Sequence, residues 1–109
     1  HDIWVLDMLN GQPVHAKQFM KGLPQLELFP KENRFLGSDG CNRIQGTLSV
    51  EGASIQFSKV LSTKMACPGM KKSNIQGMLQ QVDNWQREEG TLRFLAGDNV
   101  VVMQWKKVD

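Results

Sequence analysis

The 109-residue sequence has no long apolar run, few histidines and cysteines, and almost no excess of charge of either sign. No apolar run approaches the roughly 20 residues that a membrane-spanning helix requires, so we expect no transmembrane segment. The net charge is only +2, from 13 basic and 11 acidic residues, and the two signs are interleaved. Because nucleic-acid-binding proteins usually concentrate lysine and arginine on one face, nucleic acid is not an expected partner.

Residues suited to catalysis are also scarce. A cysteine nucleophile needs a nearby base, but the only histidines are His1, at the terminus, and His15, in an irregular segment. Ser62 and Lys64 are two residues apart, so on a strand they would share a face like a Ser-Lys dyad. No oxyanion-hole signature accompanies them, and a solvated strand face explains them better. We therefore expect no enzymatic activity.

What the sequence does contain is typical of one small globular domain that spans residues 1–109. Its 40% hydrophobic and 22% charged residues match a folded globule, and a chain of this length has no room for a second core. Turn residues recur at short intervals, which favours many short strands. In the clearest strand, Ile44, Gly46, Leu48 and Val50 alternate with polar residues, as on a half-buried strand.

The segment from Ser73 to Gln86 has the period of a helix instead. Ser73, followed three residues later by Gln76, fits a capping box. Gly77 lowers the helix propensity by about 1 kcal/mol relative to alanine, so the helix depends on packing. The sequence predicts a mainly β (α+β) fold, a curled, barrel-like antiparallel sheet with one amphipathic helix packed on it. The apolar stripe of this helix consists of Ile75, Met78, Leu79, Val82 and Trp85.

The most distinctive residues form two short motifs. The first, G-x-x-G-C-N-R-x-x-G, covers residues 37–46, and the second, T-x-M-A-C, covers residues 63–67, just before the predicted helix. An opening Trp4 and the following Gly11 precede them. In this order and spacing, the residues resemble the META domain, also called the HslJ-like family, over essentially the whole chain.

The resemblance implies a small, mainly β, barrel-like fold with one helix, in secreted or lipid-anchored proteins of the bacterial cell envelope. Some members are associated with the heat-shock response, antibiotic tolerance or virulence, and no reaction is attached to the family. It implies a non-catalytic accessory or stress-related binding domain without a cofactor. We expect a periplasmic protein or outer-membrane lipoprotein, a monomer that contacts another envelope protein or a small apolar ligand. The abrupt start at His1, without a signal peptide or lipobox cysteine, suggests either an artificially trimmed chain or a processed mature one.

If the protein is exported, as the resemblance implies, Cys41 and Cys67 are expected to form a structural disulfide. Closing a loop of about 27 residues would stabilise the fold by roughly 3.5 kcal/mol. Two alternatives stay open: a pair of buried free thiols that pack as small hydrophobes, and a mobile, redox-active pair. Asn42 is expected to hydrogen-bond local backbone. Together with the cysteines, a set of motif residues is assigned to holding the fold: Gly37, Gly40, Asn42, Gly46 and Thr63.

A second function remains as an alternative. Met65, Cys67 and Met70 are soft ligands at M-x-C-x-x-M spacing, which suits Cu(I). Against a copper site, Met65 falls on a predicted strand and is more often a core residue, and Cys67 cannot ligate a metal while it is in a disulfide. We therefore predict no metal site and keep copper handling as the alternative function. A cysteine-based enzyme or redox protein is a more remote one.

The three tryptophans, Trp4, Trp85 and Trp105, lie on different predicted elements. We expect all three to anchor the core. The alternative is that one of them, with Trp105 as the first candidate, lines a ligand cleft. A small closed sheet leaves room for one small ligand, and a helix across its opening would fill that room.

Overall fold

The computed structural model describes residues 2–69 and 74–108. In this part of the chain, one α-helix, α1 (Ile75–Gln81), and two short 3-10 helices, η1 (Ala16–Gln18) and η2 (Pro30–Glu32), accompany nine strands. The strands are β1 (Asp2–Leu9), β2 (Gln12–Pro13), β3 (Gln25–Phe29), β4 (Arg34–Ser38), β5 (Arg43–Glu51), β6 (Ser54–Ser62), β7 (Asn84–Glu88), β8 (Thr91–Ala96) and β9 (Val100–Lys107). None of the described helices is long and apolar enough to cross a membrane.

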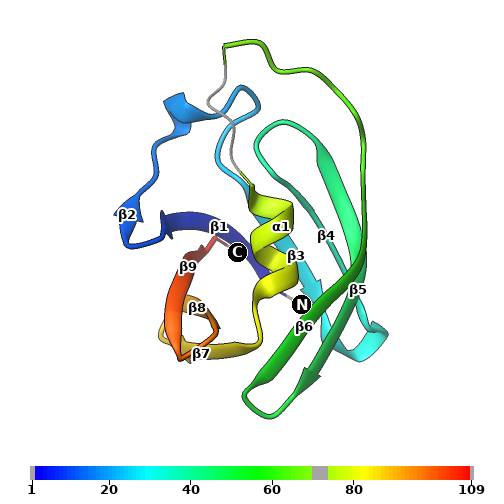
Figure 1. Cartoon of the computed structure of the whole chain (residues 1–109), viewed down its shortest axis with the longest axis vertical. Helices are drawn as coiled ribbons and strands as arrows, with labels where there is room; N and C mark the ends of the chain where they lie inside the picture. The colour runs from blue at the N-terminus through cyan, green and yellow to red at the C-terminus, as the bar shows by residue number, and fades with distance from the viewer. Residues whose placement is uncertain (1, 70–73, 109) are drawn as a thin grey trace.

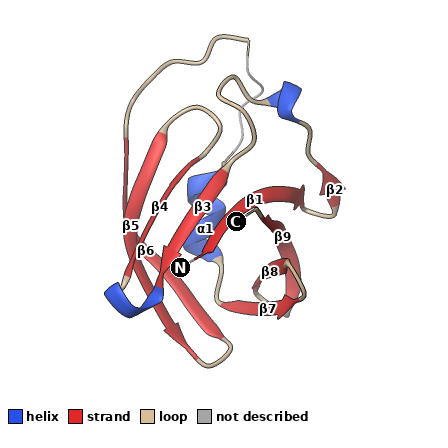
Figure 2. Cartoon of the chain, turned by 180° about the vertical axis from the view of Figure 1, so that it is seen from behind, coloured by secondary structure: helices blue, strands red, loops and turns tan. Residues whose placement is uncertain are grey.

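The strands form one antiparallel sheet that curls until its ends meet (Figure 1). Along the sheet the order is β2-β1-β3-β4-β5-β6-β7-β8-β9, and β1 also pairs with β9, which closes the ring. Figure 2 shows β1 lying between β3 and β9. The curled, mainly β architecture with one helix, predicted from the sequence, is confirmed.

The joint between β6 and β7 is much less extensive than those between the long strands. Ser54 and Asn84 are the one register pair in it, whereas β5 and β6 are paired along most of their length. Helix α1 precedes β7 in the chain and packs against β6 (Figure 1). Its buried residues Ile75 and Leu79 belong to the same core as the strands, so the helix covers the core where the sheet pairing is sparse.

The core consists of apolar side chains that alternate along the strands and point into the ring. A series of aromatic contacts runs through it: the ring centroids of Phe35 and Phe57 are 5.0 Å apart, those of Phe57 and Phe94 5.3 Å, and those of Phe94 and Trp105 6.0 Å. Edge-to-face and tilted pairs of this kind add about 0.5–1.5 kcal/mol each to the burial of their area. The predicted strand face on β5 is confirmed at Ile44 and Leu48, which are buried.

The predicted helix is too long at its C-terminal end. It stops at Gln81, Val82 is extended, and Trp85 lies on β7 instead of on the helix. The backbone N–H groups of Asp83 and Trp85 donate to the carbonyl oxygens of Leu95 and Ala53, so sheet pairing replaces the next helical turn.

The start of the helix also differs from the prediction. The cap at Ser73 lies outside the described residues, and Asn74 is the N-cap, with its side chain accepting from the N–H of Gly77 at 3.2 Å. A Cβ on Gly77 would lie only 2.5 Å from Asn74 Oδ1. Glycine therefore suits position 77 despite its low helix propensity, because the side chain of Asn74 occupies the space that a larger residue would need.

Candidate functional site

Cys41 and Cys67 form a disulfide, with an S–S distance of 2.03 Å, and no free cysteine is present. Of the three states considered from the sequence, the structure contains the structural bridge. Cys41 is buried in the turn between β4 and β5, whereas Cys67 is half-buried in the otherwise exposed segment that follows β6. The bond thus joins that segment to the sheet.

Asn42 makes a second link between the same two parts of the chain. Its Oδ1 accepts from the backbone N–H of Met65 at 2.6 Å and from the hydroxyl of Thr63 at 2.9 Å, and its Nδ2 donates to the carbonyl of Met65 at 3.4 Å. The expectation that Asn42 bonds local backbone was wrong. Asp39 takes that role, because its Oδ1 accepts from the N–H groups of Cys41 and Asn42 at 2.9 and 2.6 Å.

Two further residues extend this junction. The hydroxyl of Thr63 accepts from the N–H of Arg43 at 3.1 Å, and the N–H of Thr63 donates to the carbonyl of Arg43. Gln76, on α1, donates from Nε2 to Asp39 Oδ2 at 2.9 Å. From the sequence, Gln76 is expected only as a member of a capping box with Ser73, and Asp39 has no expected role. An aspartate two residues before Cys41 is a typical turn signal, but nothing in the sequence pointed to its helical partner.

The motif glycines lie where the chain comes close to itself. Gly40 has φ +92° and its Cα faces the ring of Phe19, so a side chain there would be strained and would overlap the ring. A Cβ on Gly46 would lie 2.7 Å from the carbonyl oxygen of Ser58. A Cβ on Gly37 would overlap backbone of β3. These contacts fit the structural role assigned to the three glycines.

The alternative metal site is not assembled as the sequence suggested. Met65 is in a coil segment and 45% exposed, so the prediction of a strand and core residue was wrong. Cys67 is in the disulfide, and Met70 lies outside the described residues. Over residues 2–69 and 74–108, no three His, Cys, Asp or Glu side chains gather as a metal ion would require. Ser62 ends β6 and Lys64 follows it in coil, so the two do not share a strand face.

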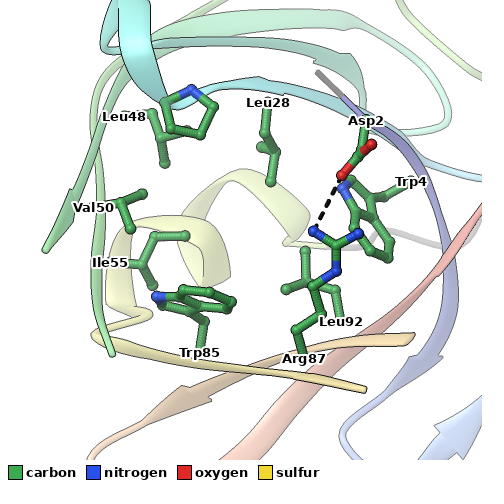
Figure 3. Close-up of a pocket in the computed structure, with 10 residues that line it drawn as sticks. Asp2, Trp4, Leu28, Leu48, Val50, Ile55, Trp85, Arg87 and Leu92 are labelled. Atoms are coloured by element: carbon green, nitrogen blue, oxygen red, sulfur yellow. Dashed lines mark ion pairs between the residues drawn. The ribbon is translucent and has the colours of Figure 1, made fainter. Parts of the chain in front are cut away.

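An apolar pocket opens at the other end of the ring (Figure 3). Its volume is about 130 Å³. The start of β1, the end of β3, the β5–β6 hairpin and β7 surround it, and the ribbon of a helix is visible behind it. The residues that line it are Asp2, Trp4, Leu28, Pro30, Leu48, Val50, Ile55, Trp85, Arg87 and Leu92.

Two tryptophans line this pocket, and neither of them is Trp105, the first candidate for a ligand cleft. Trp105 is fully buried, whereas Trp85 is half-buried and lines the pocket together with the buried Trp4. The indole N–H of Trp85 donates to the carbonyl of Gly52 at 2.8 Å, and its backbone N–H donates to the carbonyl of Ala53 at 2.9 Å. These two bonds hold the indole against the β5–β6 hairpin.

Three charged side chains meet at one side of the pocket mouth. Arg87 Nη1 is 3.3 Å from Asp2 Oδ2, and Lys107 Nζ is 3.3 Å from Asp2 Oδ1. The guanidinium carbon of Arg87 also lies 5.2 Å from the ring centroid of Trp4, a cation–π distance. One carboxylate is thus shared by two cations beside an otherwise apolar cavity.

Comparison with known proteins agrees with the motifs at the disulfide junction. The family model of the META domain matches residues 1–109. The chain belongs to the META domain family. No curated protein matches its sequence.

Solved structures share the fold of this META domain. One NMR structure is 22% identical and has a TM-score of 0.69, with 97% of this chain and 88% of that chain covered. An NMR structure of a protein from Burkholderia xenovorans is 23% identical, with a TM-score of 0.68 and coverage of 98% and 81%. A crystal structure of a DUF4847 family protein from Bacteroides vulgatus ATCC 8482 is 15% identical, with a TM-score of 0.64 and coverage of 99% and 94%.

The disulfide junction and the pocket of this META domain lie at opposite ends of the same strands. On β5, Arg43 lies at the junction and Val50 at the pocket. On β6, which runs in the opposite direction, Ile55 lies at the pocket and Ser62 at the junction. Seven residues of extended chain separate the two sites by roughly 20 Å. The motif residues therefore hold one end of the ring, and the apolar pocket opens at the other end.

Proposed function

We propose that this chain is a non-catalytic, monomeric META domain of the bacterial cell envelope, an accessory or stress-related binding module. It binds a small apolar group in the pocket between Trp4 and Trp85. The observation that carries the proposal is the pocket itself, a cavity of about 130 Å³ whose lining is apolar except for Asp2 and Arg87.

The size of the pocket sets the size of the group that it accepts. An apolar protein cavity of about 150 Å³ stays dry and binds benzene, so this pocket suits one six-membered ring or a short alkyl chain. Burying about six carbon atoms contributes about 5 kcal/mol, which corresponds to dissociation constants near the millimolar range. The occupant is a small apolar ligand or one apolar side chain of an envelope protein.

The disulfide supports the location in the envelope. Structural disulfides persist in oxidising compartments such as the bacterial periplasm and are rare in the cytosol. Cys67 lies in an exposed segment, so cytosolic reductants would have access to the bond. The same bond weakens the two alternative functions, because neither copper ligation nor nucleophilic attack can use a cysteine without a free thiolate.

The pocket is tested by titrating the isotope-labelled protein with benzyl alcohol and following its amide and indole resonances. We expect the indole N–H of Trp85 and the amides of Leu28 and Val50 to shift in a saturable way, and the indole of Trp105 to stay in place. Val50→Phe should abolish the shifts, because Val50 lines the pocket and is 37% exposed. Val101→Phe is the matched control, since Val101 is 38% exposed on β9, away from this pocket.

Shifts that do not saturate, or that persist in the Val50 variant, would overturn the binding proposal. The envelope location is tested separately in cells that express the full-length gene. Alkylation before cell lysis should leave Cys41 and Cys67 unmodified, and the protein should appear in the envelope fraction. Two alkylated cysteines in a cytosolic protein would refute the location.

A further inference from the structure

The charged side of the pocket mouth carries information about the ligand that the apolar lining does not. We infer that the ligand is a small carboxylic acid, whose apolar body lies between Trp4 and Trp85 and whose carboxylate binds Arg87. This inference rests on the pocket being the binding site and names the class of molecule that enters it.

Arg87 is placed to reach an occupant of the pocket. It lies two residues after Trp85 on β7, so both side chains leave the same face of the strand. In Figure 3 the guanidinium lies beside the open centre of the pocket and points toward Asp2. The side chain is 46% exposed, and a guanidinium has five N–H donors in a planar fork. A ligand carboxylate at the mouth can accept two of them side by side.

The balance of charge at the mouth favours an anion. Arg87 and Lys107 share the single carboxylate of Asp2, so these three linked side chains together carry a net charge of +1. A carboxylate on the ligand neutralises it. A neutral ligand gains nothing from this charge, and an ammonium group is repelled by it.

Arg87 could instead be a fixed cover over Trp4, held by the ion pair and the cation–π contact. Exposed ion pairs contribute little to stability because water and salt screen them. In the pair between Arg87 and Asp2 the side chains are 46% and 28% exposed, so water reaches both partners and the guanidinium can turn toward a ligand at modest cost. The carboxylate of Asp2 then competes with the carboxylate of the ligand. Removing Asp2 therefore distinguishes the two roles.

The experiment compares phenylacetate with phenylacetamide, which has the same shape without the charge, using the saturable shift of the Trp85 indole resonance. Because charge-assisted hydrogen bonds are stronger than neutral ones, we expect phenylacetate to bind about tenfold more tightly. Added sodium chloride should reduce this difference. Phenethylamine, the cationic member of the series, should bind more weakly than phenylacetamide.

Variants assign the effect to one side chain. Arg87→Gln should lower the affinity for phenylacetate to that for phenylacetamide, and Arg87→Lys should give an intermediate value because it keeps the charge but loses the fork. Asp2→Asn should raise the affinity for phenylacetate and leave phenylacetamide unchanged. Arg34→Gln is the matched control: Arg34 is 44% exposed, pairs with Glu32 and stacks 4.0 Å over an aromatic ring, but does not line the pocket.

The outcomes separate this inference from the proposed function. Equal binding of phenylacetate and phenylacetamide, or equal losses in the Arg87→Gln and Arg34→Gln variants, would overturn the carboxylate inference and leave the apolar pocket standing. A lower affinity for phenylacetate in the Asp2→Asn variant would show that Arg87 needs its partner and is a fixed cover. If neither probe causes saturable shifts, both the inference and the proposed function are wrong.

Discussion

Removing the disulfide should destabilise this protein by an amount that can be worked out from its place in the chain. Cys41 and Cys67 are separated by 26 positions in the sequence. Closing a loop of this length lowers the entropy of the unfolded chain, which raises its free energy by about 3.5 kcal/mol at room temperature. In the folded state Asn42 and Thr63 hold the same two segments together by hydrogen bonds. We therefore expect the folded ring to survive the loss of the bond, with the cost arising mainly in the unfolded state.

The Cys41→Ala/Cys67→Ala variant should lose about 3.5 kcal/mol of unfolding free energy, and its Tm should fall by roughly 15 °C. Chemical denaturation measures this, with the wild type in reductant as an independent comparison. Under reducing conditions Cys67→Ser should cost little, because Cys67 is half-exposed, whereas Cys41→Ser should cost more because Cys41 is buried. A loss below about 1 kcal/mol for the double variant would contradict the chain-entropy reasoning.

Two further variants test the motif residues. Asn42→Ala should cost about 1–2 kcal/mol of unfolding free energy, because Met65 and Thr63 lose their shared partner, and hydrogen exchange should quicken at the amide of Met65; unchanged exchange there would contradict this. Gly46→Ala should cost about 1–3 kcal/mol through overlap with backbone of β6. Gly52→Ala, with φ +58° but open space around it, should cost only about 1 kcal/mol; equal losses at the two positions would remove the steric argument for Gly46.

The strands could be predicted because their side chains alternate, and β5 is the clearest case. The end of the helix could not be predicted, because Val82 and Trp85 continue a helical stripe and also suit the inner face of a strand. Over so short a segment the two periods cannot be separated. The pairing of β7 with β8 decides between them, and this pairing is not visible in the segment itself.

The two ends of the ring were unequally predictable for a similar reason. The junction residues are unusual types in fixed spacing, so Cys41, Asn42 and Thr63 were identified even though the partners of Asn42 were not. Apart from Asp2 and Arg87, the pocket is lined by ordinary apolar residues from most parts of the chain, and each of these would be predicted as a core residue when taken alone. All three tryptophans were expected in the core, with Trp105 as the first candidate for a cleft. The half-exposed position of Trp85 could not be predicted, because the exposure of a tryptophan depends on which strands surround it.

This division explains why membership in the META family identifies the scaffold better than the ligand. The motifs at residues 37–46 and 63–67 fall on the junction, where they fix turns, close approaches and the disulfide. Asp2, Trp85 and Arg87, which give the pocket its polar edge and its exposed aromatic wall, lie outside both motifs. On the proposed function, a chain with the same motifs and different residues at these three positions would keep the ring and bind a different ligand. The chemistry of the ligand must therefore be sought at the pocket mouth of each protein.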